Sequence, residues 1–165
     1  MEAFPDTPVI TAIGNNDVEY HDQAPTTEDK ESYYSDLWEL MYENVPANAH
    51  IVANETIKAQ WMDGGYFAYQ LTDDIIAFSI NGMYPFWENW TDEDEANKMI
   101  EWMGGVLEDN PDQSWMTFAH VYPGNNYFTD LEVLWNITYT NKFLETIKPH
   151  QDRLIVAVGA HIHHV

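Results

Sequence analysis

Three histidines stand within four residues near the end of this chain, at positions 161, 163 and 164. They directly follow the apolar run 153–158, which has the length and composition of a buried strand. Because successive side chains of a strand point to opposite faces, His161 and His163 would lie on one side and His164 on the other. The pattern looks like a metal site at the end of a strand, with an ordinary exposed strand end or a leftover tag as the alternatives.

Two other apolar runs also end in residues that can bind a metal ion. The run 8–13 continues into Gly-Asn-Asn-Asp at 14–17, and the run 115–119 continues into His120. Taken alone, His120 would more often be an ordinary core histidine. Loops at strand ends are where α/β folds build their sites, so the shared position of the three clusters favours one common site.

The composition limits the chemistry that such a site can do. The 165 residues include six basic and 28 acidic side chains, for a formal net charge of −22, and no cysteine. This charge argues against nucleic-acid binding through a basic face, and a phosphate substrate would need bound cations to invert the local field. Without thiolates, the available metal ligands are His, Asp and Asn. No apolar run approaches the ~18 residues of a membrane span.

The periodicity of the apolar residues predicts a single α/β unit in the order β-α-β-β-α-β-α-β, without internal repeats or a clear linker. Strands are predicted at 8–13, 64–71, 75–80, 115–119 and 153–158, and the runs 64–71 and 75–80 predict a hairpin around a short polar turn. Helices are predicted after the capping patterns Thr26-x-x-Asp29 and Thr91-x-x-Asp94 and over the apolar positions from Leu131 to Ile147.

The three polar clusters, in this order, resemble the motifs of the calcineurin-like metallophosphoesterases, whose pattern runs D-x-H, G-D, G-N-H-D/E, a lone His and G-H-x-H. The acid-sphingomyelinase-like and endopolyphosphatase-like branch is most similar, because there G-N-N-D also occurs and the lone His opens H-x-x-P-G. Here residues 120–124 read H-V-Y-P-G, and residues 18–25 are similar to that branch's loop. The resemblance implies that the chain, residues 1–165, is part of a four-layer α/β/β/α sandwich with a mixed sheet.

The resemblance also implies a mechanism. In that family two divalent metal ions polarise the phosphate and activate a hydroxide for in-line attack. Asn15, His120 and His161 would hold one ion. His163 would reach the other, and Asp17 would orient the loop. Imidazole nitrogen and amide oxygen suit Zn, Fe or Mn better than Mg or Ca. The implied activity is hydrolysis of a phosphomonoester, a phosphodiester or polyphosphate.

Two features depart from the family pattern. Asn16 stands where the family usually has the histidine that protonates the leaving group; an amide can hydrogen-bond a phosphate but cannot act as a general acid. His21, in the same loop, is a candidate substitute acid. The D-x-H and G-D motifs are absent from the sequence before Gly14. In the family those motifs supply most ligands of one metal and the carboxylate that bridges both.

These departures leave several hypotheses open. The chain is either a portion of an active metallophosphoesterase domain, a catalytically inactive fragment or remnant, or a subunit whose partner chain supplies the missing motifs. A partial domain would leave an unpaired sheet edge and exposed apolar surface. A simple histidine-cluster metal binder without phosphate chemistry is a further alternative, and it predicts that His164 matters as much as His161.

Two sequence features bear on the location of the protein. Asn-x-Thr sequons occur at Asn54, Asn89 and Asn136, which is more than chance supplies in such a chain and favours a secreted or lysosomal/vacuolar glycoprotein. The first residues show no signal-peptide pattern, so a cytoplasmic location stays open.

Overall fold

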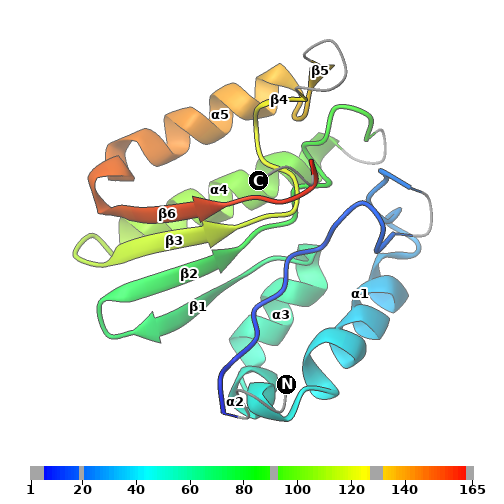
Figure 1. Ribbon diagram of the computed structural model, residues 1–165, viewed down its shortest axis with the longest axis vertical. Coiled ribbons are helices and arrows are strands. Elements are labelled where there is room, and N and C mark those ends of the chain that lie inside the picture. The colour runs from blue at the N-terminus through cyan, green and yellow to red at the C-terminus, as the bar shows by residue number, and fades with distance from the viewer. Residues whose placement is uncertain (1–5, 19–20, 90–92, 127–131, 163–165) are drawn as a thin grey trace.

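A mixed sheet of four strands forms the centre of the computed structural model, which describes residues 6–18, 21–89, 93–126 and 132–162 (Figure 1). In spatial order the strands are β1 (Phe67–Thr72), β2 (Ile75–Ser79), β3 (Ser114–Phe118) and β6 (Leu154–Val158). β1 and β2 form an antiparallel hairpin, whereas β2, β3 and β6 are parallel. The predicted α/β class, the hairpin and the mixed sheet are therefore confirmed.

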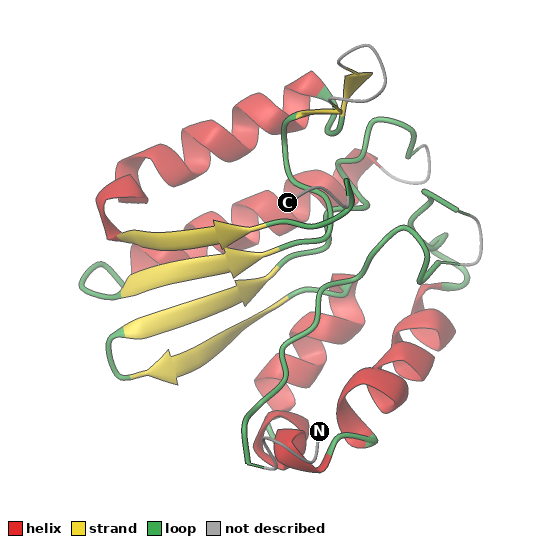
Figure 2. Cartoon of the chain, in the orientation of Figure 1, coloured by secondary structure: helices red, strands yellow, loops and turns green. Residues whose placement is uncertain are grey.

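In the view of Figure 2, the α-helices lie behind this sheet and beside it. They are α1 (Lys30–Trp38), α2 (Ala49–Val52), α3 (Glu55–Gly64), α4 (Glu93–Asp109) and α5 (Ile137–Ile147). A ribbon of β4 (Asn125–Asn126) and β5 (Glu132–Val133) is the one other sheet in the described part of the chain. The four-layer sandwich thus stays a prediction. None of the helices in the described ranges is long and apolar enough to cross a membrane.

The parallel strands bring their carboxyl ends to one edge of the sheet. The chain passes from β2 to β3 through α4 and from β3 to β6 through α5, so all three strands run in the same direction (Figure 1). Backbone hydrogen bonds continue just beyond the strands, from Ile80 N–H to Phe118 C=O (3.0 Å) and from Ala119 N–H to Val158 C=O (3.1 Å). The segments that follow β2, β3 and β6 are therefore held together.

Buried aromatic residues fasten the first helices to this end of the sheet. The hydroxyls of Tyr34 and Tyr84 lie 2.6 Å apart, and Asn81, directly after β2, donates to the Tyr34 hydroxyl and to the Gly64 carbonyl at 3.1 Å each. Trp61 of α3 donates to the Tyr34 carbonyl at 2.9 Å. Burial and the neighbouring Tyr84 raise the pKa of Tyr34, so its hydroxyl stays protonated in this network.

The predicted strand at 8–13 is wrong. The segment is extended, but side chains rather than a neighbouring strand take up its backbone groups. Asn48 accepts from Val9 N–H at 2.8 Å and donates to Val9 C=O at 3.0 Å, while Ser79 Oγ donates to Thr11 C=O at 2.6 Å. The apolar run nevertheless packs into the core at its end, because Ile13 is fully buried. The partners of its backbone groups lie far along the sequence, so the residues of the run do not predict them.

β6 is an exposed edge strand. It stands at the end of the strand order, and the exposed fractions of Ile155, Val156 and Val158 are 51%, 40% and 43%. The strand reads Leu-Ile-Val-Ala-Val and carries no charge that would discourage pairing with another strand. The predicted unpaired edge with exposed apolar surface is thus present in the described structure.

Replacement of Asn48 by alanine should test how the 8–13 segment is held. The side chain of Asn48 is fully buried, so Asn48→Ala leaves the backbone N–H and C=O of the half-buried Val9 without these partners. We expect a loss of about 2–4 kcal/mol in the free energy of unfolding, measured by urea denaturation with tryptophan fluorescence. The exposed neighbour Asn44 is the control, and Asn44→Ala should change stability by less than about 0.5 kcal/mol. Equal effects of the two changes would contradict this account.

Candidate metal centre

The turn at 14–17 presents Asn15 to the strand ends. Asp17 closes this turn, because its carboxylate accepts from Gly14 N–H at 2.8 Å and its own N–H donates to Gly14 C=O at 3.1 Å. Tyr33 of α1 donates to the Asp17 carbonyl at 3.2 Å. Burial of Tyr33 raises the pKa of its hydroxyl, and the nearby Asp17 carboxylate raises it further. Asn15 is buried with 6% exposure, whereas Asn16 is exposed.

Three of the predicted metal ligands come together at this edge of the sheet. Asn15 Oδ1 lies 2.7 Å from His120 Nε2, and the same nitrogen lies 3.2 Å from His161 Nδ1. The two imidazole rings meet edge to face, with centroids 5.2 Å apart. Asn15 and His120 are 105 residues apart in the chain, so the fold and not local sequence makes this contact.

Close backbone approaches fix His120 in this position. A Cβ atom on Gly14 would lie 2.9 Å from Cγ of His120, so only glycine lets the imidazole pack against the turn. A Cβ atom on Gly82 would lie 2.1 Å from the Val121 carbonyl oxygen. The Trp135 indole donates to that same carbonyl at 3.0 Å, which anchors the segment after β3.

His161 occupies a strained turn directly after β6. Its φ is 62°, in the left-handed region that residues other than glycine seldom adopt. The N–H of Ile162, on one side of His161, donates to the carbonyl of Ala160, on the other side, at 2.7 Å. The N–H of Ala160 donates to the His120 carbonyl at 3.0 Å. Strain of this kind costs of order 1–3 kcal/mol and clusters at functional sites. The turn carries the His161 ring to His120 and against Phe86, whose ring centroid is 5.8 Å away.

His21, the predicted substitute acid, reaches the same cluster through Asn15. Its Nε2 lies 3.0 Å from Asn15 Nδ2, and its Nδ1 lies 2.6 Å from an oxygen of Asp22. The polar chain therefore runs Asp22–His21–Asn15–His120–His161. Sequence reasoning did not single out Asp22; the signal that could have found it was its position beside His21 in the loop. His163 and His164 lie outside the described residues.

The chemistry of the converging atoms fits a divalent cation. Donor atoms that share an ion at about 2.1 Å lie about 3.0–3.4 Å from one another in octahedral or tetrahedral geometry. The distances of 2.7 and 3.2 Å at His120 Nε2 come close to this range, and a single ring nitrogen serves both contacts. Within the described residues no three His, Cys, Asp or Glu side chains form a metal-binding group. The cluster therefore combines one amide with two histidines.

The basic residues of the chain are engaged elsewhere. Lys30 pairs with Glu95 at 2.8 Å, and Lys142 pairs with Glu101 at 2.6 Å. Lys58 and Lys98 also form ion pairs, with Glu43 and Asp63, and Arg153 donates to backbone carbonyls at the end of α4. The sixth, Lys148, precedes β6 and so lies at the opposite end of the sheet from the cluster. These pairings do not place a basic side chain where an anionic substrate would meet the histidines.

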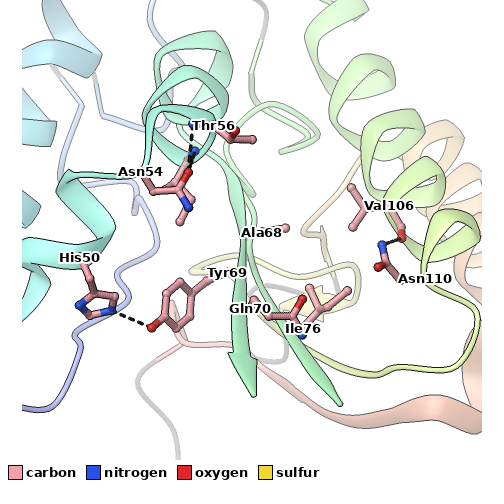
Figure 3. A pocket seen from close by; sticks show the side chains of 10 residues that line it. His50, Asn54, Thr56, Ala68, Tyr69, Gln70, Ile76, Val106 and Asn110 are labelled. Atoms are coloured by element: carbon pink, nitrogen blue, oxygen red, sulfur yellow. Dashed lines mark hydrogen bonds between the residues drawn. The ribbon is translucent and has the colours of Figure 1, made fainter. Parts of the chain in front are cut away.

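A cavity of about 380 Å³ lies away from this cluster, between α3, α4 and the edge strand β1 (Figure 3). Most of its polar side chains already make internal hydrogen bonds. Tyr69 and His50 contact each other at 2.7 Å, Asn110 donates to the Val106 carbonyl at 2.8 Å, and Asn54 accepts from the first turn of α3. The cavity therefore offers less to a metal or a phosphate than the strand-end cluster does.

Comparison with models of known protein families and with curated protein sequences finds no match to this chain. The resemblance to the calcineurin-like metallophosphoesterases therefore rests on the motifs and their order.

A methyl group at Gly14 should displace His120. Gly14→Ala places its Cβ against the imidazole, and we expect shifted ring-proton resonances of His120 together with a stability loss of about 1–3 kcal/mol from overpacking. The control is Gly105→Ala in α4, where no heavy atom lies within 4 Å of the added Cβ. That change should raise helix stability by about 0.5–1 kcal/mol. Unchanged His120 resonances in Gly14→Ala would contradict the packing described.

Proposed function

We propose that the chain belongs to a metal-dependent phosphoester hydrolase. Asn15, His120 and His161 would hold a divalent cation, with Zn, Fe or Mn preferred over Mg or Ca because two of the three donors are imidazole nitrogens. When bound, such a cation polarises a phosphoryl oxygen and lowers the pKa of a water molecule, which is the chemistry that phosphoester hydrolysis needs. The observation that carries the proposal is the contact of His120 Nε2 with both Asn15 Oδ1 and His161 Nδ1.

The charge of the chain supports a cation-dependent mechanism. At a formal net charge of −22, the protein repels a phosphate, and five of its six basic side chains make the ion pairs and backbone contacts described above. A bound divalent cation would supply the attraction that the side chains lack. The substrate is proposed as a small phosphomonoester, a phosphodiester or polyphosphate, and a second cation would be reached by His163.

The side chains around the cluster have separate tasks in this proposal. Asn16 is exposed beside the buried Asn15, so its amide can hydrogen-bond a phosphate that approaches the histidines. It has no acidic proton to give to the leaving group. His21 contacts Asn15 of the cluster. In this proposal the leaving group takes its proton from solvent.

A second candidate is a subunit that needs a partner to complete its metal site. The exposed apolar edge of β6 favours it, because this strand leads directly to His161 and has no neighbour on its outer side among the described residues. A partner strand added there would bring its own end to the cluster. Carboxylates on that strand, as in the D-x-H and G-D motifs, would supply the negative charge that three neutral ligands lack. An unpartnered chain would then bind a cation without turning over substrate.

Metal binding and hydrolysis should separate these candidates. We expect Asn15→Ala, His120→Ala and His161→Ala each to lower Co²⁺ or Zn²⁺ affinity by at least about tenfold in calorimetric titrations, because each removes a ligand. His164→Ala should have little effect; an effect equal to that of His161→Ala would favour a simple histidine cluster. His50→Gln is the control, because His50 is exposed, contacts Tyr69 and lines the separate cavity.

The activity assay uses bis(p-nitrophenyl) phosphate, nucleotides and polyphosphate with Mn²⁺, Zn²⁺ or Fe²⁺. Turnover that is lost in His120→Ala supports the hydrolase. Metal binding without turnover supports the partner-dependent subunit or a catalytically inactive remnant. Absence of metal binding in the wild-type chain would overturn all of these proposals.

We further propose a secreted or lysosomal/vacuolar location with glycans on two of the three sequons. Asn54 and Asn136 are exposed, and each caps a helix through Oδ1, which leaves the glycan-bearing Nδ2 outside the cap. Capping by itself accounts for asparagine at these two positions. Asn89 is half-buried, accepts from Ala24 N–H and donates through Nδ2 to the Tyr84 carbonyl at 2.9 Å.

Secretion from a eukaryotic host should therefore give glycans at Asn54 and Asn136 and not at Asn89, as read by mass spectrometry after endoglycosidase treatment. Asn54→Asp is a matched variant, since its carboxylate keeps the capping oxygen and removes the acceptor nitrogen. A glycan on Asn89, or none at all, would contradict the proposal.

A further inference from the structure

His21 and Asp22 form a carboxylate–histidine pair beside the candidate metal ligand Asn15. An oxygen of Asp22 lies 2.6 Å from His21 Nδ1, and His21 Nε2 lies 3.0 Å from Asn15 Nδ2. The Asp22 side chain is 16% exposed, whereas that of His21 is 63% exposed. The Asp22 carboxylate, which is largely shielded from solvent, thus contacts Nδ1 of His21. Nε2 of the same ring contacts the Asn15 amide.

The Asp22 carboxylate determines where the hydrogen atoms lie in the contacts among Asp22, His21 and Asn15. An ionised carboxylate only accepts hydrogen bonds, so Nδ1 of His21 must carry the hydrogen. In a neutral imidazole the other nitrogen, Nε2, then has a lone pair and can only accept. The Asn15 amide must therefore turn its NH₂ group to His21. Its carbonyl oxygen consequently faces His120, at 2.7 Å from Nε2.

We propose that Asp22 and His21 are positioning residues that orient the Asn15 carbonyl oxygen as a metal ligand. An asparagine amide can otherwise rotate by half a turn and present nitrogen, which does not bind a cation. Partners of metal ligands commonly fix their orientation in this way. The inference rests on the proposed metal site, and it gives His21 a task other than the predicted proton donation.

The backbone conformation and the burial of Asp22 are both energetically unfavourable. Its φ is 66°, a left-handed conformation, and its second carboxylate oxygen is buried without a hydrogen-bond partner among the described residues. Its N–H lies 3.5 Å from the Asn15 carbonyl, so the backbone brings the loop back to the turn at 14–17. Strain together with an unpaired buried acceptor is typical of a residue kept for a functional contact.

The first test reads the orientation in the metal-free protein. Long-range ¹H–¹⁵N spectra of the ¹⁵N-labelled full chain should show hydrogen on Nδ1 of His21, a lone pair on Nε2, and a shifted NH₂ resonance of Asn15. Asp22→Gly keeps the left-handed backbone and removes the carboxylate, so both signatures should disappear. Asp22→Asn tolerates the backbone, but its amide can turn an NH₂ group to Nδ1 of His21, so this variant should also lose the fixed hydrogen on Nδ1. Hydrogen on Nε2 of His21 in the wild-type chain would overturn the proposal.

The second test measures Co²⁺ affinity. Asp22→Gly and His21→Ala should each lower it by about tenfold or more, as changes at partners of metal ligands do. In an Asn15→Asp background either oxygen can bind the ion, so His21→Ala should then have almost no effect. An equal loss in both backgrounds would overturn the positioning role. If the wild-type chain binds no Co²⁺, the proposed function fails, and the metal-free spectra still decide the orientation of Asn15.

Discussion

The contact between Asn15 and His120 is the interaction on which the arrangement of this protein's candidate site depends. It joins a turn near the start of the chain to a strand end 105 residues later. Three features make it possible: the Asp17 carboxylate that closes the turn, the absence of a side chain at Gly14, and the parallel pairing of β2, β3 and β6. Because parallel strands end at one edge, His161 arrives at the same place without any long loop.

Much of the fold follows from local patterns, whereas contacts between distant segments do not. The hairpin of β1 and β2, the helix α4 and the strands β3 and β6 were all predicted from periodicity. The apolar run 8–13 was misread as a strand because its hydrogen-bond partners are side chains, among them Asn48, far along the sequence. Leu40 fits the helical spacing of its neighbours but is 64% exposed, because a π-helical turn at Glu39–Glu43 changes the register there.

The site shows the same division between what a pattern predicts and what geometry adds. The order of the polar motifs, through their resemblance to a metallophosphoesterase site, indicated Asn15, His120 and His161, and the structure brings these three together. Nothing in the spacing indicated that His21 would touch Asn15, because this contact depends on how the loop folds back. The strained turn at His161 likewise has no sequence signature.

Nitrogen-specific spectroscopy tests the central claim most directly. The claim is that Asn15, His120 and His161 share one divalent cation through Oδ1, Nε2 and Nδ1. In a Zn²⁺ titration of the ¹⁵N-labelled chain, we predict that the resonances of His120 Nε2 and His161 Nδ1 shift together and saturate at the same ratio, while those of His50 and His150 stay unchanged. Binding of Zn²⁺ that leaves His120 and His161 unshifted, or that moves His50 equally, would contradict the account.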